Sequence, residues 1–242
     1  MTATAATGAA SAKATAIVAV KRFSGAKRRL VGEIGKQQRA ALLKAMLQDT
    51  VVGLGAVAAI DRIILVTAEG RAERQVMEHV RRQPKKERKP FEVLQDPDEA
   101  GHDQAATLGI IRALSHGAGT VVLLPGDTPL LDSAELDAAL RRAGNGRVGV
   151  VPDHHGTGTN ALILTPADAI RPGFGPGSCE RHLQRARDRG LEAVTERLPS
   201  LALDCDTAAD LLAMHAILAD DPARAPHTAA VLAEIVPGLP GG

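Results

Sequence analysis

The sequence predicts a single α/β domain in which helices cover a mostly parallel β-sheet. The chain has 242 residues, of which 45% are hydrophobic, so it can bury a sizeable core. Short runs rich in Val, Ile and Leu alternate along it with segments of helical spacing. Neither a linker nor an internal repeat divides the chain. This alternation is typical of a sandwich of three layers, with the sheet in the middle.

The predicted strands are apolar runs that end at Gly, Pro or polar residues. They cover residues 14–20, 62–67, 91–94, 120–124, 147–151 and 159–164, with two further short strands over 191–198 and 201–204. Helical spacing covers 37–59, 71–82, 104–116, 133–143, 179–189 and 206–219. Asp206 or Thr207 is expected to cap the last helix. We expect a disordered leader over residues 1–13, the domain over 14–236 and a flexible tail over 237–242.

The composition excludes several classes of protein. The chain has three Phe and no Tyr or Trp, so it cannot form the aromatic platforms on which single-stranded nucleic acids stack. Its apolar runs are too short to span a membrane. Two cysteines cannot form a disulfide framework, and the N-terminus does not resemble a signal peptide. We therefore expect a cytoplasmic protein that binds neither nucleic acid nor membranes; whether it forms a homodimer is left open.

A basic loop follows the first predicted strand. Residues 21–39 contain seven basic side chains and one acidic one, in a chain whose net charge is only +1. Lys21 and Lys27 offer point charges and Arg29 offers a guanidinium fork, which suits a polyphosphate ligand. The loop matches neither the P-loop nor the dinucleotide-binding pattern. A solvated basic loop is the alternative interpretation.

Acidic side chains follow two of the predicted strands. Asp127 comes after the buried run 120–124 and a Pro-Gly break, at the edge of the sheet where α/β proteins bind ligands. Asp204 and Asp206 flank Cys205. Carboxylates at this edge could hold Mg²⁺. We favour Asp127 and Asp206 as metal ligands, with Asp204 in support. Asp127 could instead cap its turn, and which of Asp204 and Asp206 is the second ligand stays open.

Two small-residue loops are suited to an anion. The first, Gly-Thr-Gly-Thr-Asn over 156–160, includes Thr159 and Asn160 and enters a strand. The second, Phe-Gly-Pro-Gly-Ser over 174–178, opens a helix, where free N–H groups and the helix dipole converge. A plain N-cap at Ser178 is the alternative. The neighbouring pair His154–His155 does not predict a zinc site, because adjacent residues rarely both coordinate one ion.

The order of these motifs resembles one enzyme family. Lys-x₅-Lys-x-Arg-Leu, LPGDTPLL, PD-x-x-GTGTNAL, FGPGS and LALDCDT follow one another from about residue 17 to 218. This order is similar to that of the guanylyltransferases of coenzyme F420 biosynthesis, called 2-phospho-L-lactate or phosphoenolpyruvate guanylyltransferases. GTGTNAL followed by FGPGS is its most specific part.

The resemblance implies a nucleotidyltransferase fold of the glycosyltransferase-A type. It implies GTP, Mg²⁺ and an acceptor such as 2-phospho-L-lactate, phosphoenolpyruvate or 3-phosphoglycerate, with GMP transferred and pyrophosphate released. The implied catalytic residues are Lys27, Asp127 and Asp206, the last two as metal ligands. The implied nucleotide-binding residues are Lys21, Lys27, Arg29, Gly101 and Asp103, and the implied acceptor-binding residues are Thr159, Asn160, Gly175 and Ser178.

The chain departs from the family at the expected guanine contact. The family usually has Gly-Leu-Asn there, and this chain has Gly101-His102-Asp103. A carboxylate at Asp103 can still accept hydrogen bonds from guanine N1–H and N2–H₂. Two alternatives stay open: another nucleotidyltransferase of this fold, of the molybdenum-cofactor guanylyl or sugar-phosphate type, and a non-catalytic nucleotide-binding protein. The enzymes of the first alternative typically open with a Leu-Ala-Gly-Gly-x-Ser loop, which residues 19–22 do not match.

Overall fold

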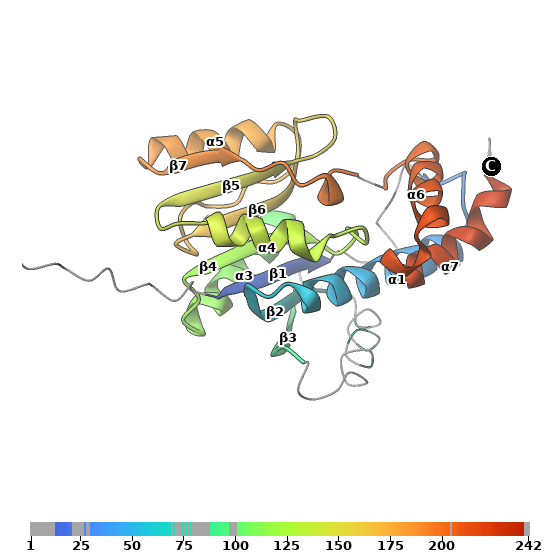
Figure 1. Cartoon of the computed structure of the whole chain (residues 1–242), viewed down its shortest axis with the longest axis horizontal. Coiled ribbons are helices and arrows are strands. Elements are labelled where there is room, and N and C mark those ends of the chain that lie inside the picture. The colour runs from blue at the N-terminus through green and yellow to red at the C-terminus, as the bar shows by residue number, and fades with distance from the viewer. Residues whose placement is uncertain are drawn as a thin grey trace, which may run out of the picture.

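The fold is a seven-stranded sheet with helices on both faces, as the computed structural model shows (Figure 1). The structure describes residues 13–20, 27, 30–68, 70, 74, 76, 78, 88–96, 101–203 and 205–239. The strands are β1 (Ala14–Val20), β2 (Ile60–Thr67), β3 (Phe91–Gln95), β4 (Thr120–Pro125), β5 (Arg147–Pro152), β6 (Thr159–Thr165) and β7 (Glu192–Thr195). The helices are α1 (Lys36–Ala56), α3 (His102–Ser115), α4 (Ser133–Arg142), α5 (Ser178–Asp188), α6 (Ala208–Asp220) and α7 (Pro226–Ile235).

The sheet is mostly parallel, as the sequence predicts. Its strand order is β3-β2-β1-β4-β6-β5-β7, with β4 at the centre. Only β6 runs antiparallel to its neighbours, β4 and β5. Because β1, β2, β3 and β4 are parallel, their carboxyl ends meet at one edge of the sheet. In such folds this edge is where ligands bind.

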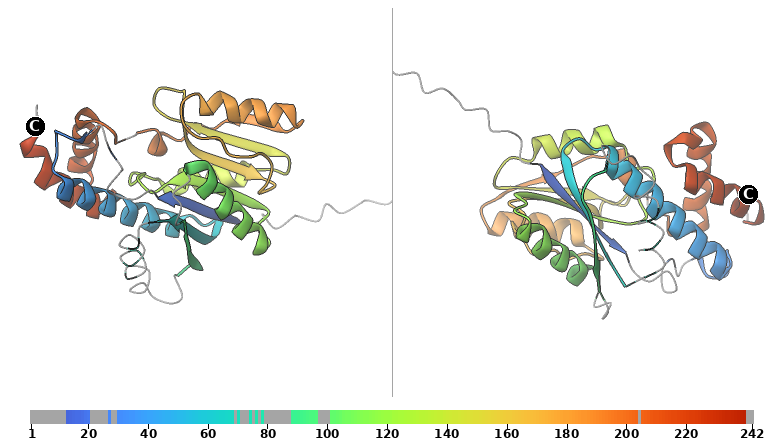
Figure 2. Two further views of the ribbon diagram at one scale, coloured as in Figure 1. Left: turned by 180° about the vertical axis from the view of Figure 1, so that it is seen from behind. Right: turned by 90° about the horizontal axis from the view of Figure 1, so that it is seen from below.

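Each face of the sheet carries its own apolar core. Alternate residues of a strand point to opposite faces, so Ala16 and Val18 of β1 contact the cluster that includes α1 and α4. Ile17 between them belongs to the cluster that includes α3 and α5. The two layers of helices are visible on either side of the sheet in Figure 2. The core is almost entirely aliphatic, as the composition predicts.

A third cluster joins α6 and α7 to the N-terminal half of α1 (Figure 1). Leu42 and Met46 of α1 are fully buried in it with Cys205, Met214 and Leu232. The buried carboxylate of Asp49 in α1 strengthens the contact. Its two oxygens accept from the backbone N–H groups of Thr228 and His227 at the start of α7, at 2.7 and 3.3 Å. Since Cys205 is anchored here, the residues that follow it are held close to the end of β4.

The C-terminal third departs from the sequence prediction in two places. The strand predicted over 201–204 is wrong: a 3₁₀ turn, Pro199–Leu201, precedes an irregular segment. Asn160 explains this, because its side-chain amide donates to the carbonyl of Leu201 at 2.8 Å, which removes a group that a strand would need. The sequence prediction also lacks α7 and places only the helix over 206–219 before the tail. The strand predicted over 191–198 is confirmed as the shorter β7.

Several predictions fall at or beyond the edges of the described residues. The leader over 1–13 lies outside them apart from Lys13, and the helix over 71–82 lies largely outside, although residues 74, 76 and 78 are helical. The predicted tail begins inside the 3₁₀ turn Val236–Gly238, and residues 240–242 lie outside the described part. Within the described segments, no helix is long and apolar enough to cross a membrane.

Gly109 allows α3 to approach the sheet closely. A Cβ atom on Gly109 would overlap Cγ2 of Ile17 and lie 3.3 Å from Cγ2 of Val66. These are β-branched side chains of two inner strands, so they cannot move aside cheaply. We expect Gly109→Ala to lower the free energy of unfolding by about 1–3 kcal/mol, measured by urea denaturation.

The matched control is Gly55→Ala in α1, where a Cβ atom would meet nothing within 4 Å. Alanine there should raise stability by about 0.5–1 kcal/mol, since it reduces the entropy of the unfolded chain. Equal effects of the two substitutions would contradict the close approach of α3 to β1.

Candidate active site

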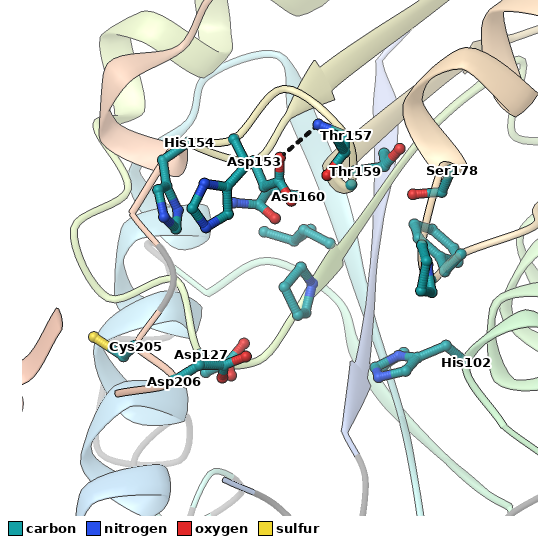
Figure 3. A pocket seen from close by; sticks show the side chains of 18 of the residues that line it. His102, Asp127, Asp153, His154, Thr157, Thr159, Asn160, Ser178, Cys205 and Asp206 are labelled. Carbon is teal, nitrogen blue, oxygen red and sulfur yellow. Dashed lines mark hydrogen bonds between the residues drawn. The ribbon is translucent and has the colours of Figure 1, made fainter. Parts of the chain in front are cut away.

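A cavity of about 760 Å³ opens at the carboxyl edge of the sheet. Its size is within the range of small-molecule sites. Its walls come from β1 and β4, the start of α3, the β5–β6 loop, the loop before α5 and the loop before α6. Figure 3 shows Asp127 and Asp206 together at one end, and Thr157, Thr159 and Ser178 with the further acid Asp153 toward the other. The cavity therefore combines two chemically different halves.

The acidic half contains three of the predicted residues. Asp127 follows β4, and Asp206 precedes α6; their carboxylates lie side by side in Figure 3. The ammonium of Lys27 lies 2.5 Å from Oδ2 of Asp127 and 3.1 Å from Oδ1 of Asp206. The side chain of Lys27 is only 5% exposed, against 29% and 47% for the two acids. Both carboxylates thus converge on one cationic atom, with the acids open to the cavity.

Mutual electrostatics keep these groups charged. Burial alone would raise the pKa of the Asp127 carboxyl, but the Lys27 ammonium and its hydrogen bond hold that pKa below its usual range. Burial likewise opposes the charge on Lys27, and the two carboxylates raise the pKa of its ammonium above the ordinary value. The Asp127 carboxylate is therefore ionised at neutral pH and presents oxygen atoms to the cavity.

Local structure leaves Asp206 available to the cavity. Thr207 caps α6, because its hydroxyl accepts from the backbone N–H of Asp210 at 3.2 Å and the carboxylate of Asp210 accepts in return. Of the two capping residues that the sequence allows, the structure selects Thr207. Asp204 lies outside the described residues, as do Lys21 and Arg29.

The other half of the cavity is built on the loop before α5. Gly175 (φ +96°) and Gly177 (φ +70°) adopt conformations that favour glycine. The guanidinium of Arg181 binds the carbonyls of Gly173 and Pro176, each at 2.6 Å. Because the carbonyls of this loop are occupied by Arg181, the loop is held in one shape around the start of the helix.

The hydroxyl groups of two predicted residues face this half. Ser178 is fully buried, and its Oγ has no hydrogen-bond partner among the described residues, although it lines the cavity. Thr159, at the start of β6, also lines it, and its Oγ1 lies 3.0 Å from Nδ1 of His182. Asn160 lines the cavity too, but its amide is already bound to the carbonyl of Leu201. An unpaired buried hydroxyl at a helix N-terminus is suited to an anionic ligand.

The predicted guanine contact has a structural partner of its own. The carboxylate of Asp103 accepts from the backbone N–H of Phe174 at 2.7 Å, so it links α3 to the loop before α5. Gly101 and Asp103 do not line the cavity, whereas the intervening His102 does. The role of Gly101 and Asp103 in binding guanine stays a prediction.

Sequence reasoning missed the residues that support the site from behind. Arg181 and His182 come from the helix that Ser178 opens, and they bind the loop and Thr159. The signal in the sequence is spacing: His182 follows Ser178 by four residues, which places both on one helix face.

His154 and His155 lie at the cavity wall with ring centroids 3.7 Å apart. Among the described residues, no three His, Cys, Asp or Glu side chains form a metal-binding group.

Comparison with known proteins assigns the family. The model of the family described as "Guanylyl transferase CofC like" matches residues 14–222. The chain belongs to this guanylyltransferase family. A phosphoenolpyruvate guanylyltransferase from Conexibacter woesei is 40% identical over 223 residues, which are 91% of this chain and 96% of that protein. Another from Sphaerobacter thermophilus is 37% identical over 83% of this chain and 93% of that protein.

Solved structures confirm the predicted fold of this family member. A nucleotidyl transferase from Methanothermobacter superposes with a TM-score of 0.60 at 18% identity, over 86% of this chain and 98% of that one. A 4-diphosphocytidyl-2C-methyl-D-erythritol synthase from Anaerococcus prevotii superposes with a TM-score of 0.58 at 13% identity, over 86% and 99%. Taken with the guanylyltransferase relatives, the fold identifies the protein as a nucleotidyltransferase.

Burial gives His182 a measurable effect on stability. Burial and the charges of Arg185 and Arg181 lower the pKa of His182 to about 4 from its ordinary 6.5, against a small opposite effect of Asp103. Between these values the unfolded chain binds more protons than the folded one. We therefore expect the free energy of unfolding to fall as pH drops from 6.5 to 4, by about 3 kcal/mol at most from this group.

Denaturation at a series of pH values measures this effect, with His182→Asn as the comparison. The variant lacks the titrating ring, so its stability should depend less steeply on pH over this range. Equal slopes for the two proteins would show that His182 does not titrate in this way.

Proposed function

We propose that the protein transfers GMP from GTP to the phosphate of a small three-carbon phospho-acid and releases pyrophosphate. Phosphoenolpyruvate is the first candidate acceptor, because the two relatives above carry that name, and 2-phospho-L-lactate and 3-phosphoglycerate are the others. The observation that carries the proposal is the pairing, in one cavity, of an acidic half with a hydroxyl-lined half at a helix N-terminus. From the resemblance to the F420-pathway enzymes, we also propose that the reaction belongs to coenzyme F420 biosynthesis and that the protein works in the cytoplasm.

The acidic half is suited to the metal-bound triphosphate. Asp127 and Asp206 would hold Mg²⁺, and the residues fit, because two carboxylates already converge on one cationic atom and offer only oxygen ligands. The ion supplies positive charge against the phosphates of GTP. If these acids held the metal, the Lys27 ammonium would be free to contact the leaving pyrophosphate. Lys21 and Arg29 are predicted to do the same.

The other half is suited to the acceptor. The hydroxyl of Ser178, the hydroxyl of Thr159 and the backbone of Gly175 surround the N-terminus of α5, which favours a dianion. Asn160 holds this wall in place through its bond to the carbonyl of Leu201. The acceptor phosphate and the α-phosphate of GTP would then meet between the two halves.

The reaction needs positioning more than proton transfer. A phosphate oxygen of the acceptor attacks the α-phosphorus of GTP; one P–O bond forms there while the bond to the β-phosphate oxygen breaks. The attacking oxygen is already ionised at neutral pH, so no general base is required. Lys27 stabilises the negative charge that develops on pyrophosphate. This account agrees with a cavity whose described lining includes the Lys27 ammonium and several hydroxyl groups, whereas the fully buried imidazole of His182 does not line it.

Guanine would lie against the aliphatic wall of the cavity. Ile17 and Ala19 of β1 and Ala106 of α3 line this wall. We assign the base contact to Gly101 and Asp103, as the resemblance implies. One oxygen of Asp103 already accepts from Phe174, so the second would accept from guanine N1–H and N2–H₂.

Pyrophosphate release from purified protein, GTP, Mg²⁺ and each of the three acids tests the proposal. We expect one acid to support turnover and the reaction without acid to release almost none. Two results would contradict it: release at the same rate when no acid is added, or no release with any of the three acids.

Replacing Asp127 tests the acidic half. Asp127→Asn keeps the shape but removes the charge that holds Mg²⁺, so turnover should fall by about 10³-fold or more. The matched control is Asp137→Asn, since Asp137 is an acid bound to Arg141 and the backbone of Ala59, away from the cavity. The control should keep its activity. Near-normal turnover of a folded Asp127→Asn protein would overturn the metal assignment.

Replacing Ser178 tests the acceptor half. Ser178→Ala removes a donor to an anion and should raise the acceptor KM about tenfold, with the GTP KM changed less than about twofold. Ser200→Ala is the control, because Ser200 has an equally unpaired, buried hydroxyl that does not line the cavity. It should change neither constant. A larger effect of Ser178→Ala on GTP than on the acid would contradict the assignment.

A further inference from the structure

His182 is a buried imidazole whose two nitrogens bind two different parts of the acceptor half. It has no exposed surface, and it lies on α5, one turn beyond Ser178. Its Nε2 lies 2.9 Å from the backbone nitrogen of Gly173, and its Nδ1 lies 3.0 Å from Oγ1 of Thr159. The ring itself does not line the cavity, whereas Thr159 does. It therefore acts on a ligand only through its neighbours.

These contacts determine which nitrogen carries the proton. A backbone N–H can only donate, so Nε2 of His182 must accept from Gly173 with a lone pair. A neutral imidazole carries one N–H, which is then on Nδ1 and points at Thr159. His182 is thus a donor to the Thr159 hydroxyl, and the alternative tautomer would set two N–H groups against each other at Gly173.

The consequence for Thr159 is a fixed hydrogen-bond direction. Its Oγ1 accepts from His182, so its own hydrogen must point elsewhere, and no other acceptor binds it among the described residues. Thr159 faces the cavity beside Ser178 (Figure 3). Phosphate and carboxylate oxygens accept hydrogen bonds, whereas an amine or ammonium group would require the opposite direction.

The surroundings keep the ring neutral. Burial is the largest cause of its low pKa, Arg185 and Arg181 on its own helix add to it, and Asp103 of α3 acts in the opposite direction. The resulting pKa of His182, about 4, lies far below neutral pH. The direction of the bond to Thr159 is therefore constant over the physiological range.

We propose that His182 is a positioning residue that makes the Thr159 hydroxyl an obligate hydrogen-bond donor to the anionic group of the acceptor. This inference rests on the proposed function for the identity of the acceptor. The same ring also holds the loop before α5 at Gly173. It thereby couples the shape of the loop to the direction of the hydroxyl, and it selects an anion over a donor group.

Two substitutions separate the two contacts. In His182→Asn the side-chain amide nitrogen takes the place of Nδ1, so the donor to Thr159 is kept and the bond to Gly173 is lost. In His182→Gln the amide oxygen takes the place of Nε2, so the bond to Gly173 is kept and the donor is lost. We expect the Gln variant to raise the KM for phosphoenolpyruvate about ten- to a hundredfold and the Asn variant to raise it less than about threefold. The GTP KM should change little in both.

A double-mutant cycle links the effect to Thr159. Thr159→Val removes the hydroxyl with little change of volume, so adding His182→Gln to it should not raise the acceptor KM further. His227→Gln is the control for loss of a hydrogen-bonded histidine, since His227 binds Asp49 between α1 and α7, away from the cavity. It should leave both KM values unchanged. An Asn variant as impaired as the Gln variant, or additive effects with Thr159→Val, would overturn the proposal.

The tautomer can be measured without any turnover. ¹⁵N NMR of the imidazole, assigned by the loss of its signals in His182→Gln, should show Nδ1 protonated and Nε2 unprotonated from pH 5.5 to 8. Protonation of Nε2 in this range would overturn the inference. If the wild-type protein shows the expected tautomer but releases no pyrophosphate with any acid, the proposed function fails while the hydrogen-bond direction stands.

Discussion

The rest of the site depends on one set of ion pairs at the edge of the sheet, between two carboxylates and one ammonium. Asp127 and Asp206 come from segments almost eighty residues apart, and their charges would repel each other at close range. The Lys27 ammonium between them offsets this repulsion in a partly buried setting. The backbone of Lys27 has φ +54°, an unusual value for a residue other than glycine. Such strain is maintained only by the surrounding structure, here by the ion pairs of Lys27 with Asp127 and Asp206.

The helices at the C-terminal end are what bring the second acid to the first. α6 and α7 pack on α1 through an aliphatic cluster, and Cys205 is buried within it. The neighbouring Asp206 is therefore held beside Asp127, although the two residues lie next to different elements, α6 and β4. The same principle operates in the other half of the cavity, where Asp103, Arg181 and His182 fix the loop before α5 through hydrogen bonds. Rigid supports behind both halves give a positioning mechanism its accuracy.

The sheet and the first acid could be predicted from the sequence because they depend on local patterns. A run of buried aliphatic residues followed by Pro-Gly is enough to place Asp127 at the end of a central strand. Thr159 and Ser178 were identified in the same way, from small-residue loops at the start of a strand and of a helix. The order of these motifs also predicts the family, and the match over residues 14–222 confirms it.

The supporting residues depend on long-range contacts, so spacing places His182 on the helix face of Ser178 but does not show what its ring binds. His182 matters only because α5 packs on β5 and β7 in a way that brings its ring to Thr159 at the start of β6, and a buried histidine on a helix is common in any core. The segment 201–204 has the composition of a strand, yet the Asn160 side chain binds the carbonyl of Leu201, and the described residues 201–203 form no strand. α7 begins at Pro226 after a short polar segment, and its stability comes from packing on α1 rather than from a strong local pattern.

The central claim is that GTP and the acceptor bind in the two halves of one cavity and react at the α-phosphorus of GTP. ³¹P NMR of a reaction with GTP, Mg²⁺ and phosphoenolpyruvate tests it most directly, because it reports which P–O bond is made and which is broken. The account predicts pyrophosphate together with a pair of coupled resonances from a new diphosphate that joins guanosine to the acid. Formation of GDP and inorganic phosphate, or of free GMP with unchanged phosphoenolpyruvate, would contradict it.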